Sequence, residues 1–549
     1  MPNKTPIEKE IRDIFGRYES WKAENDYIDF DDMLFEALLL LQRSDDLLAS
    51  MRRRFKYILC DEWQDTNPLQ YALIKLILGP QQNLFVVGDP NQCIFGFNGA
   101  DVSIINDFDQ EFPQAKVYGL DVNYRSTASI VGLGNKIISG SALRHKNLLK
   151  ATKTNEHRPQ YLRPNTTDDE ARLIAEDIRN AVLRGNRKYS DYAIIYRTAS
   201  SSRAMFEQLV LQQLPFISFN KGESFYEQAI VKPVIAHLRL ALDPKSFDSI
   251  ESILPTLYLN REKTMDYVQT QDLLDPKEKP IFHLITLPDL KPFQKQQLFD
   301  RIKLIDAIKN MKPDAAIREI RKGYDKYLDA DERKKVTLHK EMIQETLSEI
   351  EASAKRFDSV SEFLSFIELI IEKHKEMEEL REDPNTEALH MMTIHKSKGL
   401  EYPIVYLIGA SETILPHSSA LEANERDDMI SEQKGAVKVE AALEEEKRLA
   451  YVAITRAKEE LKISSPSYFR GEQVEVSRFL LEAFSDGPTS DTKPQGKVEA
   501  LVWECMSKVC NGWMRITTYD EAQREERKCP MCRFPMKKGS RVIGVSAAR

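Results

Sequence analysis

Apolar residues near the start of the chain recur at helical spacing. In the run FDDMLFEALLLL, residues 30–41, they fall three and four positions apart, which gives a helix one apolar face. Residues 1–55 are therefore expected to be helical and amphipathic.

Two short apolar runs follow, at 57–60 and 84–87, and each is followed by acidic residues. Short β-rich runs separated by helical stretches are typical of parallel strands in an α/β sheet. Ligands bind such sheets at the carboxyl ends of the strands, which is where Asp61 and Glu62 fall. The pattern predicts an α/β domain over residues 1–115.

A second α/β set follows, in which a stretch of mostly helical pattern at 246–385 interrupts the strands. We expect a second parallel-sheet domain at 116–245 plus 386–483, split by a helical insertion domain. Residues 421–443 are interpreted as a charged loop or short helix pair, and the Pro/Gly/Ser/Thr-rich residues 484–500 as a linker. The strands are expected at residues 116–120, 192–196, 389–394, 404–408 and 461–464.

Composition narrows the class of protein. Of the 549 residues, 42% are hydrophobic and 30% charged, as in ordinary globular proteins. No apolar stretch approaches the roughly 18 residues needed to span a bilayer, and the charged N-terminus does not resemble a signal peptide. A cytoplasmic location without a membrane partner is expected. The net charge of −8 argues against a small, purely basic DNA-coating protein.

Four of the six cysteines cluster near the C-terminus, whereas Cys60 and Cys93 are isolated in apolar surroundings. Two pairs with metal-like spacing can close a tetrahedral Zn²⁺ site, which would be structural because four thiolates leave no open position. We predict a zinc ribbon at 501–541, with free surface thiols as the alternative. Its ligands would be Cys505, Cys510, Cys529 and Cys532.

The carboxylates after the first strand suggest phosphate chemistry. One acid of such a pair can hold Mg²⁺ through water while the other orients and deprotonates an attacking water. For Asp61 and Glu62 alone, an ordinary charged loop is the alternative, but the longer string DEWQDTN (61–67) is far more specific.

DEWQDTN resembles the Walker B motif of the UvrD/Rep/PcrA-like superfamily 1 DNA helicases. Four more segments resemble later motifs of this family, in family order, and the resemblance covers roughly residues 25–480. The family implies two RecA-like domains that close around ATP·Mg²⁺ while single-stranded DNA moves across them. The four segments are GDPNQCIFGFNGAD (88–101), LDVNYRST (120–127), MTIHKSKGLEYPIVYLIG (392–409) and EEEKRLAYVAITRAKEEL (444–461).

The resemblance implies roles for individual residues at the nucleotide. Asp61 would hold the metal, Glu62 would be the base, and the amide of Gln92 would sense the γ-phosphate. Arg125 and Arg456 would neutralise charge on that phosphate, which a planar guanidinium does well.

The resemblance also implies contacts with the sugar and with DNA. Glu401 would meet the nucleotide sugar, and Thr393 with His395 would contact the DNA backbone. Phe95 and Phe97 would stack on single-stranded bases, with core packing as an equal alternative for Phe95.

A phosphate-binding P-loop needs GxxxxGK followed by Ser or Thr, and no such string occurs in the 549 residues. The first RecA-like domain is thus expected to be incomplete, and the chain should not hydrolyse ATP unaided. The expected function is an ATP-dependent 3′-to-5′ helicase or translocase acting on single strands and duplex junctions, with the P-loop supplied by an N-terminal segment or partner polypeptide. The alternative is a non-catalytic DNA-binding or partner-binding subunit, and a helicase–nuclease fusion is disfavoured.

Overall fold

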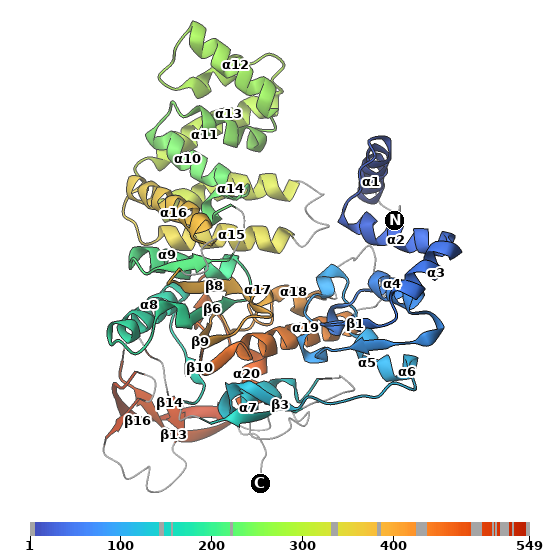
Figure 1. Ribbon diagram of the computed structural model, residues 1–549. Helices are drawn as coiled ribbons and strands as arrows, with labels where there is room; N and C mark the ends of the chain where they lie inside the picture. Colours follow the sequence, from blue (N-terminus) through green and yellow to red (C-terminus); the bar gives the residue numbers. More distant parts are fainter. Residues whose placement is uncertain are drawn as a thin grey trace.

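Figure 1 presents the computed structural model, in which a sheet-based body carries a tall helical layer at one end and a small separate sheet at the other. Among the residues described, no helix combines the length and apolar character needed to cross a membrane. The structure describes residues 6–141, 148–154, 157–219, 223–330, 339–381, 386–423, 436–484, 497–507, 510, 513–515, 526–529 and 532–544.

The first α/β unit, residues 6–115, begins with three helices, which confirms the helical prediction for this region. An Asp29 carboxylate accepts the backbone N–H of Asp32 and starts the second helix with a capping box. The two predicted strands form and pair in parallel. The elements are α1 (Pro6–Glu24), α2 (Phe30–Arg43), α3 (Asp45–Arg54), β1 (Ile58–Cys60), α4 (Pro68–Leu78), β2 (Leu84–Val86), α5 (Ser103–Asn106) and α6 (Phe108–Glu111).

Apolar side chains of this first unit remain in contact with solvent. Leu59 on β1 is 73% exposed and Phe85 on β2 is 59% exposed. Helix α4 has the apolar sequence PLQYALIKLIL, yet none of its residues is buried. Parallel sheets are normally covered on both faces, so two strands with exposed apolar side chains leave this unit without a closed core.

The second α/β unit, residues 116–245 and 386–484, is built on a six-stranded parallel sheet in the order β5-β10-β9-β6-β8-β7. The predicted strands at 192–196, 389–394, 404–408 and 461–464 are confirmed, with ends shifted by a few residues. The strands are β5 (Gln160–Leu162), β6 (Tyr192–Tyr196), β7 (Phe216–Ser218), β8 (Leu389–Thr393), β9 (Tyr402–Leu407) and β10 (Ala457–Ser464).

Helices cover both faces of this sheet. Every residue of β6 is buried, with Ile194 in one apolar cluster and Ile195 in the other. This alternation explains why β6 is a continuous apolar run rather than a half-polar one. The helices are α8 (Thr167–Leu183) and α9 (Arg203–Leu211) on one face, and α7 (Ala128–Ile138), α19 (Ala436–Ile454) and α20 (Arg478–Phe484) on the other.

One predicted strand is wrong. Residues 116–120 form no strand, and β3 (Val122–Thr127) starts after them and pairs in parallel with β4 (Lys150–Lys153). Tyr118 is 78% exposed and Leu120 is 79% exposed. Within the described part of the chain, the apolar side chains of this stretch therefore remain largely in solvent.

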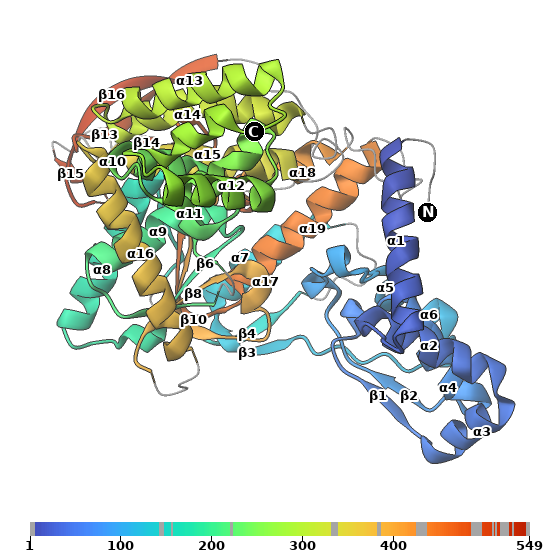
Figure 2. The same ribbon diagram turned by 90° about the horizontal axis from the view of Figure 1, so that it is seen from above.

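The helical insertion leaves the sheet after β7 and returns at the adjacent β8, and Figures 1 and 2 show it standing over the edge of the second unit. The prediction of helices at 246–385 is confirmed for the described residues; residues 331–338 and 382–385 lie outside them. The helical region begins earlier than predicted, at Lys232. Its helices are α10 (Lys232–Leu242), α11 (Phe247–Ile253), α12 (Arg261–Leu274), α13 (Pro292–Ile308), α14 (Pro313–Ala330), α15 (His339–Ala354) and α16 (Val360–Leu380).

Buried charges join this insertion to the second unit. Arg203 on α9 donates to Glu207 at 2.6 Å and to Glu349 on α15 at 2.8 Å, and all three side chains are at most 4% exposed. Tyr226 donates its hydroxyl to Glu207 at 2.5 Å. A buried pair is costly to break because the remaining charge loses its partner.

The C-terminal sheet is antiparallel, in the order β14-β13-β16-β15. Its first strand begins at Lys497, so the last residues of the predicted linker at 484–500 belong to the sheet, while α20 ends at Phe484 and residues 485–496 lie outside the described part. The strands are β13 (Lys497–Cys505), β14 (Trp513–Arg515), β15 (Arg527–Lys528) and β16 (Pro535–Gly544).

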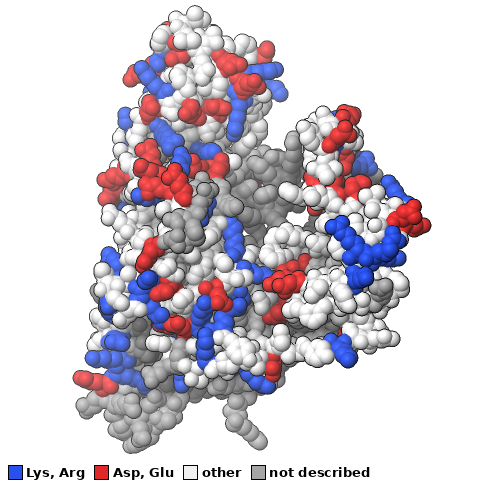
Figure 3. Space-filling model, viewed as in Figure 1, with Lys and Arg blue, Asp and Glu red and all other residues white. Residues whose placement is uncertain are grey.

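Residues 421–443, predicted to be a charged loop or short helix pair, are described only at their two ends. Helix α18 (Ser418–Leu421) lies before the undescribed residues 424–435, and α19 starts at Ala436. The C-terminal part of this stretch, residues 436–443, is thus the start of a long helix. Among the described residues on the face shown in Figure 3, Lys and Arg are interspersed with Asp and Glu.

Candidate nucleotide and nucleic-acid site

The two carboxylates after β1 lie on a tight turn. Glu62 has φ 49°, a left-handed conformation that is costly for a residue with a side chain, and the short 3₁₀ turn Trp63–Asp65 follows it. Asp61 accepts the backbone N–H of Glu62 at 2.8 Å, and both side chains are exposed. The strained turn thus presents two acids at the carboxyl end of a strand.

A chain of hydrogen bonds connects Glu62 to Gln92. The buried Gln64 donates its amide to Glu62 and accepts the backbone N–H of Asp89 at 2.9 Å. Asp89 in turn accepts the side-chain amide of Gln92 at 2.9 Å. The carboxylate at the end of β1 and the amide after β2 are therefore held in one network.

Arg456 reaches this network from the second unit. Its Nη2 lies 3.4 Å from the side-chain oxygen of Gln92, while Nη1 donates to the carbonyl of Leu400 at 3.1 Å. Burial, together with the positive charge of Arg125, lowers the pKa of Arg456 to about 10. The guanidinium therefore stays charged at neutral pH although the residue is only 1% exposed.

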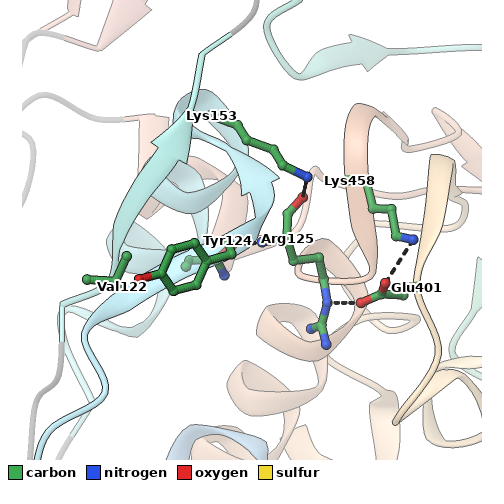
Figure 4. Close-up of a pocket in the computed structure, with 7 residues that line it drawn as sticks. Val122, Tyr124, Arg125, Lys153, Glu401 and Lys458 are labelled. Atoms are coloured by element: carbon green, nitrogen blue, oxygen red, sulfur yellow. Dashed lines mark hydrogen bonds and ion pairs between the residues drawn. The ribbon is translucent and has the colours of Figure 1, made fainter.

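An open cavity of about 490 Å³ lies where β3 and β4 meet the ends of β9 and β10 (Figure 4). Glu401 pairs there with Lys458 at 2.8 Å and with Arg125. The hydrogen bond from Lys458, followed by that from Arg125, holds the pKa of the Glu401 carboxyl below its usual value. The structure thus brings Arg125 and Glu401 into direct contact on the wall of one cavity.

Lys398, which we did not single out from the sequence, bridges the two units. Its side chain is only 7% exposed, and its ammonium donates to Asp65 and, at 2.8 Å, to the carbonyl of Gln92. It also lies 5.0 Å from the centre of the Phe95 ring. The signal for this residue was its place inside the motif at 392–409.

The predicted DNA-contacting rings gather beside these groups. The ring of Phe97 is 68% exposed and lies 5.2 Å from the ring of His395. Phe95 is half-buried against the core of the second unit. Part of its ring therefore packs in the core, as the alternative interpretation expected, and part remains accessible. Burial lowers the pKa of His395 to about 4, which leaves the imidazole neutral at pH 7.

Thr393, the other predicted contact to the DNA backbone, starts the short helix α17 (Ile394–Ser397). Its hydroxyl accepts the backbone N–H of Lys396 at 3.4 Å. The free amide groups at a helix start favour anions, but a helix of one turn adds little by itself. The side chain therefore has a local structural partner besides any ligand.

The four C-terminal cysteines meet in one place. Their sulfur atoms all lie within 4.8 Å of one another, with Cys505 and Cys532 at 3.3 Å and Cys510 and Cys529 at 3.9 Å. Four ligands at about 2.3 Å from a tetrahedral Zn²⁺ would be about 3.8 Å apart. The N–H of Arg533 donates to the carbonyl of Cys529 at 2.8 Å. The donor set and its spacing fit one tetrahedral ion.

The acids after β1, together with Arg125 on β3 and Arg456 just before β10, are consistent with a helicase fold. A family model of the UvrD-like helicase C-terminal domain matches residues 118–468, and one of the UvrD/REP helicase N-terminal domain matches residues 1–113. The chain belongs to the UvrD-like helicase family. A third model, Cold-inducible protein YdjO, matches residues 488–545, which include the C-terminal sheet.

Curated relatives extend the same similarity. The chain is 34% identical over 482 residues to "Putative ATP-dependent DNA helicase YjcD" of Bacillus subtilis (strain 168), covering 87% of this chain and 61% of that protein. It is 28% identical over 495 residues to ATP-dependent DNA helicase PcrA of Staphylococcus epidermidis, covering 87% and 64%. The chain thus spans a little under two thirds of the length of these relatives.

Proposed function

We propose that this chain forms most of the motor of an ATP-dependent 3′-to-5′ DNA helicase or translocase. The observation that carries the proposal is the contact between Arg456 and Gln92, because it joins an arginine of the second unit to the network behind Glu62. An exposed acid and a buried cation joined through one hydrogen-bond network suit phosphoryl transfer, where catalysis is mostly positioning and charge stabilisation.

Each side chain has a role in this proposal. Glu62 accepts a proton from the attacking water, Asp61 holds the hydrated metal, and Gln92 orients the water. Arg456 and Arg125 neutralise charge on the transferred phosphoryl group, and Glu401 meets the sugar. Mg²⁺, when bound, would neutralise charge on the phosphate oxygens.

Arg125 is paired with Glu401 in the present arrangement, so the proposal requires this ion pair to loosen or rearrange when a nucleotide enters. The pair is more than a third exposed on the Glu401 side, and exposed pairs of this kind contribute little to stability. Rearrangement is therefore energetically inexpensive.

The proposed nucleic-acid partners are single-stranded DNA and junctions of duplex with single strand. Phe97 and the exposed part of Phe95 offer rings to unstacked bases without regard to sequence, which suits a translocating motor. His395 lies beside them from the second unit, and Thr393 is two residues before it in the chain. These contacts would let movement between the two units act on the strand.

We also propose that the phosphate-binding loop comes from a segment outside the 549 residues, either continuous with residue 1 or carried by another polypeptide. The exposed apolar side chains of β1, β2 and α4 support this, because a further strand and helix would bury them. Its loop would then lie beside Asp61 and Glu62 at the end of β1.

The first experiment measures ATP hydrolysis and single-stranded DNA binding by the purified chain, with Glu62→Gln as the control for a contaminating ATPase. We expect DNA binding without hydrolysis. Hydrolysis that DNA stimulates and that Glu62→Gln abolishes would overturn the proposal of an outside loop while supporting the motor.

The second experiment separates the motor from a non-catalytic DNA-binding or partner-binding subunit. The DNA upstream of the start codon is sequenced for an open frame that encodes GxxxxGK[ST], and the extended polypeptide is assayed. DNA-stimulated hydrolysis by the extended form supports the motor. An extended form that binds DNA and never hydrolyses ATP supports the non-catalytic subunit.

For the C-terminal sheet we propose a structural Zn²⁺ site formed by Cys505, Cys510, Cys529 and Cys532. The spacing of the sulfur atoms supports it, and a sheet of this size with a small core gains stability from a metal staple. Four thiolates would saturate the ion, so its role would be to hold the fold together.

A further inference from the structure

The loop at residues 92–97, here called the aromatic loop, links two parts of the proposed motor. Its first residue, Gln92, belongs to the network behind Glu62, and it ends in the rings of Phe95 and Phe97. The loop belongs to the first unit in sequence. Its backbone makes turn hydrogen bonds within the first unit, and side chains of the second unit also hold it, namely those of Lys398, Arg448 and Glu445.

Helix α19 supplies two of these contacts, and Figure 2 shows it running from the sheet of the second unit toward the first unit. Arg448, which is 9% exposed, donates from Nε to the carbonyl of Cys93 at 2.7 Å. Glu445 accepts the backbone N–H of Gly96 at 3.2 Å. Each is a hydrogen bond between a charged side chain and a peptide group, which is stronger than a neutral one.

Gly96 shows how closely the helix and the loop fit. A Cβ placed on Gly96 would lie 2.9 Å from one carboxylate oxygen of Glu445 and 3.0 Å from the other. Any larger residue would have to push the Glu445 carboxylate or the loop aside. The hydrogen bonds that Glu445 and Arg448 make to the loop go to its backbone, so their influence on the rings acts through the backbone.

We infer that Arg448 and Glu445 are positioning residues which hold the aromatic loop so that Phe95 and Phe97 can stack on single-stranded bases. The inference rests on the proposed DNA binding by these rings and assigns control of their placement to α19. Helix α19 ends at Ile454, two residues before Arg456. If α19 moves when Arg456 meets a nucleotide, the rings would therefore move as well.

The test measures the affinity for a fluorescently labelled oligo-dT at several salt concentrations. The variants are Arg448→Met, Glu445→Ala and Phe95→Ala, and Glu440→Ala is the matched control because Glu440 is an exposed glutamate on the same helix. We expect Arg448→Met and Glu445→Ala to weaken binding about fivefold or more, as the loss of a stacked base would. Glu440→Ala should leave it unchanged.

Two further readouts distinguish positioning from direct contact. The slope of log affinity against log salt should not change, because a lost phosphate contact would reduce it by about one. Combining either variant with Phe95→Ala should weaken binding by less than the product of the two single effects, because both act on the same ring.

Gly96→Ala gives a milder probe that does not remove a buried charge. It should weaken DNA binding in the wild-type background and have a smaller effect when combined with Glu445→Ala, since the obstructing carboxylate is then gone. Thermal unfolding of each variant identifies any loss of binding that comes from misfolding.

A reduced salt slope, strictly multiplicative effects with Phe95→Ala, or a Glu445→Ala variant that behaves like Glu440→Ala would each overturn the inference. Failure of the wild-type chain to bind oligo-dT would instead overturn the proposed DNA binding, and the inference would fall with it.

Discussion

Arg203 donates from Nε to Glu349 at 2.8 Å, and this buried contact ties α9 of the second unit to α15 of the helical insertion. The same guanidinium also holds Glu207. One cation therefore neutralises two buried carboxylates that belong to different parts of the fold.

Arg203→Met is expected to lower the free energy of unfolding by up to about 3–5 kcal/mol, because it removes the cation that Glu207 and Glu349 share and leaves each buried carboxylate with one other partner, Arg356 and Arg470 respectively. The measurement is the urea midpoint followed by circular dichroism. Arg318→Met is the control, since Arg318 is 47% exposed and its loss should cost about 0.5 kcal/mol or less. Equal shifts for the two variants would contradict the expectation.

Glu170 on α8 gives a pH dependence of stability. Burial raises its pKa to about 7 from the usual 4.5, although it accepts the backbone N–H of Gly409 at 3.2 Å. The folded state therefore keeps a proton that the unfolded state loses, so this contribution to stability is complete below about pH 4.5 and disappears as the pH rises through 7.

Glu170→Gln should remove this dependence. At pH 8 the variant is expected to be more stable than the wild type by at most about 3 kcal/mol, and at pH 4.5 the two should be similar. Urea midpoints of both proteins between pH 4.5 and pH 8 provide the comparison. If the stability of the wild type and that of the variant change with pH in parallel through this window, the titration of Glu170 is ruled out.

The cysteine cluster predicts metal content. The purified chain is expected to carry about one Zn²⁺ per molecule, measured by elemental analysis, and Cys532→Ser should lose most of it. Cys60→Ser is the control because Cys60 lies outside the cluster. Removal of the metal with a chelator should make the region around β13–β16 sensitive to proteases while the six-stranded sheet stays resistant.

Phe97 predicts a DNA phenotype of its own. Phe97→Ala should weaken binding of single-stranded DNA about fivefold or more without altering the salt slope, because a ring is lost and no phosphate contact is. Phe30→Ala is the control, since Phe30 is an even more exposed phenylalanine, at 89%. The proposed stacking role is wrong if the two variants bind alike.

The sequence predicted most of the sheet because local pattern carries that information. β6 is a fully buried strand, and its five-residue apolar run is the pattern expected of a buried strand. Residues 116–120 have a similar pattern and form no strand, because a strand also needs a neighbour and no described strand pairs with this stretch. Local hydrophobicity cannot report whether a partner is present.

The contacts between the units were harder to predict. Arg448 and Cys93 are 355 residues apart in the chain, and the contact joins the Arg448 side chain to the backbone carbonyl of Cys93. Every residue has such a carbonyl, so the amino acid at position 93 gives no sign of the contact. Arg125 and Arg456 were singled out as candidates because they lie within family motifs. The pairing of Arg125 with Glu401 was not expected, since both were assigned to the nucleotide.

The strand order of the second unit determines when during translation its sheet can be completed. β5 at the sheet edge pairs with β10, where Gln160 is opposite Lys462. A ribosome must therefore translate about three hundred further residues, including the entire helical insertion, before β5 meets its partner. Contacts so distant in sequence form slowly. The nascent chain thus carries an unpaired strand edge for most of its synthesis, and this edge is where chaperones would be needed.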